Sequence, residues 1–407
     1  MSGGELPGFE PERADFYLGN PDVAFAALRA RDPVHWHEAG GFWCVLRHAD
    51  VREVSRHPRR FCSGRGTQLH QIPLARRGVS ISGDAEQLGL APSIIQMDPP
   101  AHNRHRKLVI GQFTPQVTAN LERRVREIAR ESLAQVPVGA SVDFVDAVAI
   151  PLPMLVIAEL LGIPREDRLH FRRWSDAMIE AGGGGFSEKT GQTLFEMFAY
   201  LGDLLKRRQG DPRQDLISTL LHAEIDGERL SQPEVMMFCI TLLVAGNETT
   251  RNLISGGTQA LLDHPSELAK LVASPALLPN AVEEMLRFVT PVRSFARCVT
   301  ADVELGGKRI AKDDFLVLFY GSANRDEAVF GPDANRFEIE RGSARQHLAF
   351  GSGEHLCLGA PLARLEARVL FEELLPRLPG LRCDGPALPL ASVLIHGVER
   401  MPVVFEA

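Results

Sequence analysis

Residues 350–359 read Phe-Gly-Ser-Gly-Glu-His-Leu-Cys-Leu-Gly, so one cysteine lies among closely spaced glycines. His355 stands two positions before Cys357, Gly359 stands two positions after it, and a helix-forming stretch follows at once. A helix N-terminus favours a negative charge, and amide hydrogens beyond the cysteine can donate to sulfur. Gly353 and Gly359 would let the backbone approach a flat macrocycle. An isolated thiolate held in this way suits an axial position of a haem iron, whereas a buried cysteine in a glycine-rich turn would not need the full spacing.

The composition of the 407-residue chain is that of an ordinary globular protein, with 44% apolar and 24% charged residues. A formal net charge of -7 argues against a nucleic-acid partner. The six cysteines are scattered without a CxxC pair, which excludes the common zinc patterns and indicates reduced thiols. Residues 1–17 lack the pattern of a signal peptide, and the apolar run 236–244 is too short to cross a bilayer. We therefore expect a cytoplasmic protein without a membrane anchor.

Helical periodicity dominates the chain up to about residue 295. The longest helix should run from Ser231 to about Asp263. Ser231 and Glu234 form a capping box at its start, and the pair His264-Pro265 marks its end. At 1.5 Å per residue it would be roughly 48 Å long and would run through the centre of a large helical protein. Other helices are expected at 21–31, 101–112, 115–135, 150–161, 166–180, 188–208 and 213–223.

Beyond about residue 295, short alternating runs replace the helical period. A hairpin is also expected at 33–46, with its turn at Ala39-Gly40-Gly41. We therefore expect a mainly α fold with a small β-rich portion, organised as a single domain over residues 1–407. Strands are expected at 297–305, 309–311, 315–320, 392–396 and 401–405.

Four consecutive glycines, Gly182 to Gly185, interrupt the helical pattern. Such a tract has high backbone freedom. It is either a plain linker or the hinge of a mobile lid over a pocket.

The middle of the long helix carries the hexapeptide Ala245-Gly246-Asn247-Glu248-Thr249-Thr250. Threonine is a weak helix former and an unpaired buried carboxylate is costly, so these residues are poor choices for a buried helix centre. Gly246 removes side-chain bulk where a ligand could approach. An acid beside an alcohol can pass protons through water. The alternative is a polar patch on the helix surface, but the flanking apolar residues favour burial.

In two further pairs of residues, the two members are separated by about one helical turn. Glu284 and Arg287 form an i,i+3 pair of a kind that is usually a solvated surface pair. His102 and Arg106 share a helix face and could bind an anion such as a carboxylate, or could belong to a basic surface helix.

These motifs together resemble those of the cytochromes P450. Residues 350–359 match the family's haem-binding loop, Phe-x-x-Gly-x-(His/Arg)-x-Cys-x-Gly, at every position, and the resemblance extends from about residue 15 to 405. It implies the P450 fold, with a long central helix over the haem and no fused reductase. It also implies a monomeric mono-oxygenase that uses haem b, dioxygen, and two electrons from an external ferredoxin and its NAD(P)H-dependent reductase.

The resemblance also implies roles for individual residues. Cys357 would be the proximal ligand of the haem iron, and Glu248 with Thr249 would deliver protons for cleavage of the O–O bond. Glu284 and Arg287 would form a buried structural pair, braced by Arg336. The expected haem contacts are Ala245, Phe350, Gly351 and Gly359 and, at the propionates, His102, Arg106, Arg297 and His355, with Arg293 ranked second to Arg297.

Family position places the substrate pocket at mostly apolar residues, which favours a lipophilic substrate such as a sterol, branched lipid or terpenoid. A polyketide or an aromatic intermediate is the alternative. A basic proximal surface would suit an acidic ferredoxin, with Arg345, His347, Arg364 and Arg368 as its candidates. The expected pocket residues are Ile94, Ile95, Val244, Val292, Phe295, Val393, Leu394 and Ile395.

Two other classes of haem protein also fit the cysteine loop. A peroxide-driven peroxygenase would not need the acid–alcohol pair and would turn over with hydrogen peroxide alone. A non-catalytic haem sensor would bind haem through Cys357 without substrate-linked oxygen consumption.

Overall fold

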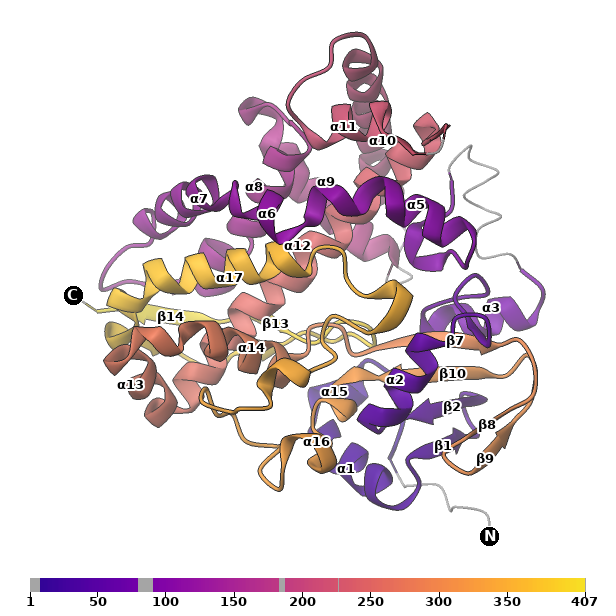
Figure 1. Ribbon diagram of the computed structural model, residues 1–407. Coiled ribbons are helices and arrows are strands. Elements are labelled where there is room, and N and C mark those ends of the chain that lie inside the picture. Colours follow the sequence, from indigo (N-terminus) through magenta and orange to yellow (C-terminus); the bar gives the residue numbers. More distant parts are fainter. Residues whose placement is uncertain (1–7, 80–90, 183–186, 226, 407) are drawn as a thin grey trace.

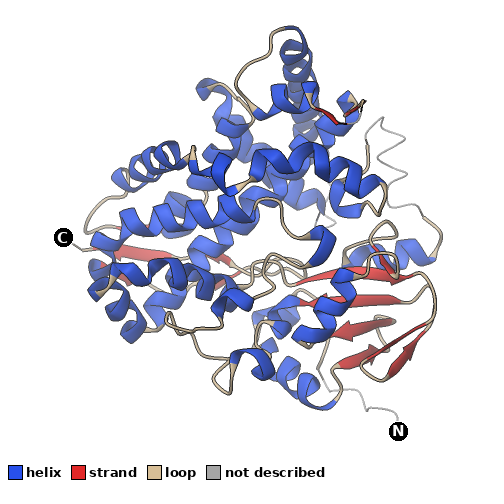
Figure 2. Ribbon diagram, in the orientation of Figure 1, coloured by secondary structure: helices blue, strands red, loops and turns tan. Residues whose placement is uncertain are grey.

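Helices fill most of the molecule, and the largest sheet lies at one end of it (Figure 1, Figure 2). The computed structural model describes residues 8–79, 91–182, 187–225 and 227–406. Three of the four glycines at 182–185 lie outside these residues. The prediction that this tract is either a linker or the hinge of a lid therefore falls outside the described part of the chain. Within the described part, no helix combines the length and the apolar character needed to cross a membrane. The expected mainly α fold with a small β portion is confirmed.

The helices occur in most of the predicted places. In chain order they are α1 (Pro21–Arg31), α2 (His48–Arg56), α3 (Ile72–Arg76), α5 (Ala101–Ile110), α6 (Pro115–Ala119), α7 (Glu122–Ala134), α8 (Pro151–Leu160), α9 (Arg168–Gly182), α10 (Glu188–Gly210), α11 (Leu216–His222), α12 (Gln232–Asp263), α13 (Pro265–Ala273), α14 (Leu278–Val289), α15 (Tyr320–Ala323), α16 (Glu327–Phe330) and α17 (Ala360–Leu374).

The strands are short and form one larger sheet and several small ones. They are β1 (Val34–His37), β2 (Phe42–Val45), β3 (Phe61–Cys62), β4 (Ser141–Asp143), β5 (Glu224–Ile225), β6 (Glu228–Arg229), β7 (Ser294–Val299), β8 (Val303–Leu305), β9 (Lys308–Ile310), β10 (Phe315–Phe319), β11 (Leu381–Cys383), β12 (Leu388–Pro389), β13 (Val398–Arg400) and β14 (Pro402–Phe405).

The largest sheet has the strand order β1-β2-β10-β7-β3. Strand β10 is parallel to β2 and antiparallel to β7, and every residue of β10 is buried. A strand buried on both faces is the apolar centre of its sheet. The hairpin β1–β2 pairs His37 with Phe42 across the predicted turn. The sheet thereby holds Arg297, within β7, in a well-packed part of the molecule.

Helix α12 has 32 residues and crosses the middle of the molecule (Figure 1). The Ser231 hydroxyl accepts a hydrogen bond from the Glu234 amide at 3.4 Å, and the Glu234 carboxylate accepts one from the Ser231 amide at 2.6 Å. The predicted capping box and the predicted extent of this helix are therefore confirmed. Helices α8, α14 and α17 all pack against α12. The hexapeptide 245–250 consequently lies inside the molecule, although some of its residues face an internal cavity.

Three predicted elements differ from the structure. The single strand expected at 297–305 is divided into β7 and β8. The helix expected at 115–135 is divided into α6 and α7. Between them the amides of Asn120 and Leu121 donate to carbonyls three residues back, at 3.2 and 3.0 Å, which tightens the chain into a turn. The strand expected at 392–396 is wrong. There the Ser392 hydroxyl accepts from the amides of the second and third residues after it, at 3.2 and 3.0 Å, which competes with strand pairing.

A buried ionic network ties α14 to the chain that leads toward residues 350–359. Glu284 and Arg287 are both completely buried, and two parallel hydrogen bonds of 2.7 Å join them. The second arginine on Glu284 is Arg341, whose Nε lies 3.2 Å from the carboxylate and which is also buried. The sequence-based choice of Arg336 is wrong: its side chain is 73% exposed, and only its backbone carbonyl accepts a bond from Arg287. Which of the two arginines reaches the Glu284 carboxylate depends on how the loop packs around it, and the spacing of residues in the sequence does not describe this packing.

Replacing Arg341 by alanine should destabilise the protein by about 3 kcal/mol, because it removes a buried partner of Glu284 and leaves carbonyl groups without a donor. Arg336→Ala is the matched control, and its effect should stay within about 0.5 kcal/mol. Urea unfolding of the two purified variants and the parent provides the comparison. Equal losses of stability would show that Arg341 does not brace the network.

Candidate functional site

A cavity lies between the middle of α12 and the loop that leads into α17. Ala245 and Thr249 line it from α12, while Leu356 and Cys357 line it from the loop. Leu356 is a large apolar residue, yet 45% of it is exposed, because it borders this space. The cavity is therefore a mainly apolar slot with one sulfur atom on one side.

Cys357 is held by the backbone of its own loop and is accessible through the cavity. Its amide donates to the Phe350 carbonyl at 2.9 Å, and the amides of Gly359 and Ala360 donate to its sulfur. Burial raises the pKa of the Cys357 thiol, and these two amides and Arg106 oppose the rise without cancelling it. The expected donors to sulfur are thus present, but they do not by themselves produce a thiolate. A bound metal ion would deprotonate the thiol.

Two glycines near the site serve packing. Gly353 has a φ of +72°, and a side chain there would meet the backbone of Ser55 and Arg56 at the end of α2. A side chain on Gly246 would collide with Ile157 of α8. Gly353 does not line the cavity, so the expectation that it lets the backbone approach a macrocycle is corrected. Gly246 does line the cavity, as expected of a residue that leaves room for a ligand, and its missing side chain also serves the contact with Ile157. The first lets the loop dock on α2, and the second lets α12 pack against α8.

Four basic side chains gather at one part of the cavity lining: His102, Arg106, Arg297 and His355. The rings of His102 and His355 lie 4.2 Å apart, and Nε2 of His355 is 3.2 Å from Ser63 Oγ. Burial, followed by the charges of Arg297 and its basic neighbours, lowers the pKa of His355 to about 2. Among the described residues, neither Arg106 nor Arg297 has a carboxylate partner. This concentration of unpaired positive charge fits a ligand with carboxylates.

Thr249 faces the cavity, and its hydroxyl donates to the Ala245 carbonyl at 2.6 Å. Glu248 does not line the cavity. Its buried carboxylate lies 2.6 Å from the Arg251 guanidinium and accepts from the Asn252 side chain at 3.1 Å. Burial raises the pKa of Glu248, and Arg251 and Asn252 oppose this shift. The acid and the alcohol are thus adjacent in sequence, but only the alcohol reaches the cavity.

Of the remaining expected haem contacts, one lies outside the cavity and four line it. Arg293 does not line the cavity, because its Nε donates to the carbonyls of Ser392 at 3.0 Å and Ile395 at 3.1 Å. Its side chain is thereby held against the C-terminal loop. The contacts that do line the cavity are Ala245, Phe350, Gly351 and Gly359.

The expected substrate-pocket residues also divide into two groups. Those that line the cavity are Ile94, Ile95, Val292 and Phe295. Those that do not are Val244, Val393, Leu394 and Ile395. Val244 is separated from the lining residue Ala245 by the rotation of about 100° between successive helical residues. Residues 393–395 follow Ser392, whose hydroxyl accepts from the amides of Leu394 and Ile395. The segment is therefore not a strand, and the directions of its side chains could not be predicted from one.

The cavity has further apolar lining that sequence reasoning missed. Phe238 and Leu242 lie seven and three residues before the expected contact Ala245 on α12, so the three residues share one helix face. That period is the signal that could have identified them. Phe113 and Ile157 come from other helical segments, and only tertiary packing brings them to the cavity.

Glu366 is a second residue that the motifs did not indicate. It lies on α17, lines the cavity, and is 1% exposed. Its Oε2 has no hydrogen-bond partner. Burial raises the pKa of Glu366 to about 8. A carboxyl group with this environment is held neutral at moderate pH because nothing compensates the loss of water around its charge.

The four basic residues expected on a docking surface are in different environments. His347 is buried and lies 3.0 Å from the Glu283 carboxylate, which also pairs with Arg364 at 2.7 Å. Arg368 pairs with two glutamates, at 2.6 and 2.7 Å. Arg345 is exposed, and no described residue forms an ion pair with it. Only Arg345 therefore offers its full charge to a partner.

The residues around this cavity fit a haem group. A sulfur ligand lies on one side, apolar side chains form the slot, and basic side chains gather where two carboxylates could be held. The basic side chains are available for the two carboxylates, because Arg106 and Arg297 have no acidic partner among the described residues.

The family model for cytochrome P450 matches residues 272–379. The linalool 8-monooxygenase of Pseudomonas putida is 35% identical over 408 residues, which cover 97% of this chain and 99% of that protein. The vitamin D(3) 25-hydroxylase of Pseudonocardia autotrophica is 38% identical over 410 residues, which cover 96% of each. Among solved structures, cytochrome P450 CYP109Q5 from Chondromyces apiculatus has a TM-score of 0.85 at 40% identity, with 96% of each chain covered.

The raised pKa of Glu366 predicts a pH-dependent stability. The folded protein holds this proton up to pH about 8, whereas an unfolded chain releases it near 4.5. The folded state therefore binds more protons between these values, and its stability should fall by up to about 1.4 kcal/mol per pH unit as pH rises through that window. Glu366→Gln removes the titration. Its stability relative to the parent, measured by urea unfolding, should rise between pH 5 and about 8; an unchanged difference would contradict the assignment.

Proposed function

The chain belongs to the cytochrome P450 family, a family of haem mono-oxygenases, and we propose that it hydroxylates a lipophilic small molecule with haem b bound through Cys357. The observation that carries the proposal is the arrangement around one cavity. The sulfur of Cys357 lines it together with the Thr249 side of α12, and unpaired arginines border it. Neither a structural cysteine nor a surface helix would need all three features.

Under this proposal the protein orients the cofactor through two sets of contacts. Cys357 would supply the sulfur that holds the haem iron, and the amides of Gly359 and Ala360 donate to this sulfur. Arg106 and Arg297, with His102 and His355 beside them, hold the propionates. Haem held in this way would supply the chemistry of dioxygen activation, which a thiolate ligand favours.

Proton delivery is assigned to Thr249 and Glu248. The Thr249 hydroxyl donates to the Ala245 carbonyl, so its oxygen is free to accept a hydrogen bond from water in the cavity. Glu248 is paired with Arg251 and lies outside the cavity lining. It can pass a proton to the cavity only when its side chain leaves Arg251 or when a water chain bridges the gap. The burial that raises the pKa of Glu248 favours the protonated form that such transfer requires.

The apolar lining supports a lipophilic substrate. Ile94, Phe238 and the pair Val292 and Phe295 come from three separate segments and all line the same space. Linalool and vitamin D(3), named for two relatives, are a terpenoid and a secosteroid, and both are largely apolar. We assign the substrate to the same broad class of sterols, branched lipids and terpenoids. A polyketide or an aromatic intermediate is distinguished from it by a binding panel scored through the loss of iron-bound water.

Electrons are assigned to a ferredoxin and its NAD(P)H-dependent reductase. The basic side chains expected to meet an acidic ferredoxin are mostly engaged in internal ion pairs, which leaves Arg345 as the main free cation of that set. Docking therefore depends on Arg345 more than on Arg364 or Arg368. Turnover with ferredoxin and reductase, and little with hydrogen peroxide alone, distinguishes this route from a peroxygenase.

The reduced protein under carbon monoxide should show the red-shifted absorption band of a thiolate-bound haem. Cys357→Ala should abolish this band, because no other sulfur lines the cavity in the described chain. Cys383→Ala is the matched control, since Cys383 is also exposed but lies on β11 outside the cavity. Persistence of the band in Cys357→Ala would refute the assigned ligand.

Thr249→Ala should lower the yield of hydroxylated product per NAD(P)H consumed by roughly tenfold, because one proton-delivery group is lost. Thr258→Ala is a close control. Its hydroxyl also donates to the carbonyl four residues before it, at 2.9 Å, but it is buried away from the cavity. Product yield and cofactor consumption are measured together with one accepted substrate. An equal yield in both variants would remove Thr249 from the proton path.

A further inference from the structure

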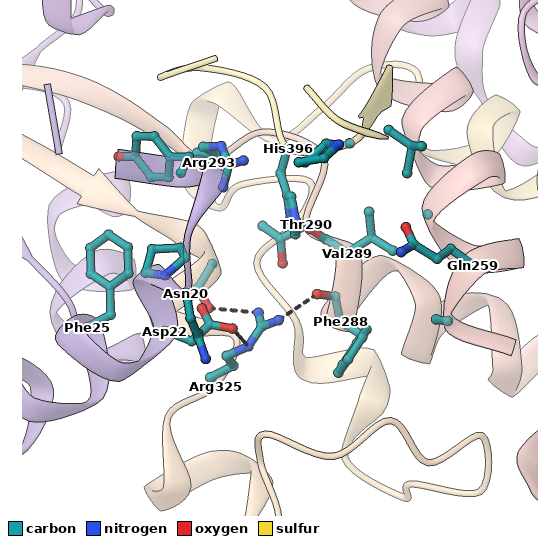
Figure 3. Close-up of a pocket in the computed structure, with 18 of the residues that line it drawn as sticks. Asn20, Asp22, Phe25, Gln259, Phe288, Val289, Thr290, Arg293, Arg325 and His396 are labelled. Carbon is teal, nitrogen blue, oxygen red and sulfur yellow. Dashed lines mark hydrogen bonds and ion pairs between the residues drawn. The ribbon is translucent and has the colours of Figure 1, made fainter. Parts of the chain in front are cut away.

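A second cavity lies apart from the cysteine loop, and Figure 3 shows it in close-up. Its volume is ≈ 450 Å³, within the range of small-molecule sites. It lies where the segment 17–25 meets the C-terminal part of α12, the chain after α14, the α15 region and the C-terminal loop. None of its lining residues belongs to the cavity beside Cys357. The residues that define it for the argument are Tyr17, Asp22, Gln259, Arg293, Arg325 and His396.

Arg293 is the unusual member of this second cavity. It is only 9% exposed, and its guanidinium carbon lies 4.2 Å from the centre of the Tyr17 ring. Its Nε donates to two carbonyls of the C-terminal loop, at 3.0 and 3.1 Å. Its two terminal nitrogens have no acceptor among the described residues, and Arg293 lines the cavity. A buried cation with unused donors is costly unless a partner neutralises it.

The other charges in the second cavity are already engaged or lie at its edge. Arg325 pairs with Asp22 at 2.9 Å and donates to the Phe288 carbonyl at 3.1 Å; Figure 3 shows both contacts. His396 bonds to the Val289 carbonyl through Nδ1. Asp263 is exposed. Arg293 is therefore the one charge in the described lining that is both buried and without an opposite partner.

A thin wall of backbone separates the second cavity from the cavity beside Cys357. It consists of residues 291–293 and 394–396, joined by the bonds from Arg293 N to Leu394 O and from His396 N to Pro291 O, each 2.8 Å long. Val292 faces the cysteine cavity, whereas Arg293 faces the second cavity. Successive residues of an extended segment point to opposite sides. Two distinct pockets are therefore built on the two faces of one wall.

We propose that the second cavity binds the carboxylate of a small organic molecule, with the terminal nitrogens of Arg293 as the group that recognises it. A guanidinium with two free nitrogens matches the two oxygens of a carboxylate. Phe25, Phe288 and Phe319 also line the cavity and provide apolar surface for the body of the ligand. The rigid hold on Nε and the stacking on Tyr17 keep the donors in place before the ligand arrives.

The test uses 4-fluorobenzoate and its neutral isostere 4-fluorobenzamide. Each is titrated into the haem-loaded protein, with imidazole kept on the iron, and binding is followed by ¹⁹F NMR. The Soret band should stay that of the imidazole complex, which shows that the probe has not displaced imidazole from the iron. Fluorobenzoate should bind at least tenfold more tightly than fluorobenzamide. Arg293→Gln should weaken fluorobenzoate binding by at least tenfold.

If Arg293→Gln does not fold, a second variant tests whether the carboxylate binds in this cavity. Gln259→Glu adds a negative charge to the cavity lining, and the Gln259 side chain makes no hydrogen bond to the described residues that this change would remove. The variant should also weaken the binding of fluorobenzoate at least tenfold. Gln116→Glu makes the same change on exposed α6 and should leave the affinity unchanged. Equal binding of the acid and the amide, an affinity insensitive to Gln259→Glu, or no binding at millimolar concentration would each overturn the proposal.

Discussion

The buried pair of Glu284 and Arg287 is the interaction on which the site depends. Besides Glu284, Arg287 donates to the carbonyls of Asn324, Ala334 and Arg336 at 2.9, 2.6 and 2.7 Å. Asn324 in turn accepts from the amide of Leu348 at 2.6 Å, two residues before the cysteine loop begins. Taking two charges out of water costs several kcal/mol for each, so the pair persists only because every donor is used. Leu348 is thus tied to α14 by hydrogen bonds, and the cysteine loop begins two residues later along the chain.

Helix α12 meets a different constraint, because its two sides must satisfy different neighbours. Gly246 allows close contact with α8, while Ala245 and Thr249 remain open to the cavity. Glu248 is turned to Arg251 and is kept out of the cavity. The same alternation occurs in the chain after α14, where Val292 and Arg293 serve opposite pockets. Adjacent residues therefore acquire unrelated functions from the geometry of the backbone.

Much of the fold could be predicted from local sequence signals. The capping box at Ser231 and the break at His264-Pro265 bound α12 correctly, because both are interactions among residues close in sequence. The strand expected at 392–396 failed because Ser392 binds the amides that a strand would have used. The choice of Arg336 failed because both arginines lie in the same loop region, and only packing brings Arg341 to Glu284.

The sequence alone determined the family resemblance, the cysteine loop and the acid–alcohol pair, because these depend on residue type and short spacing. The tertiary structure decided which residues share a space. It placed Val292 and Phe295 beside Cys357 but kept Val244 and residues 393–395 away from that cavity. It also turned Arg293 from an expected partner of the haem cavity toward a second pocket. Side-chain direction depends on how distant segments pack, and no local motif records that packing.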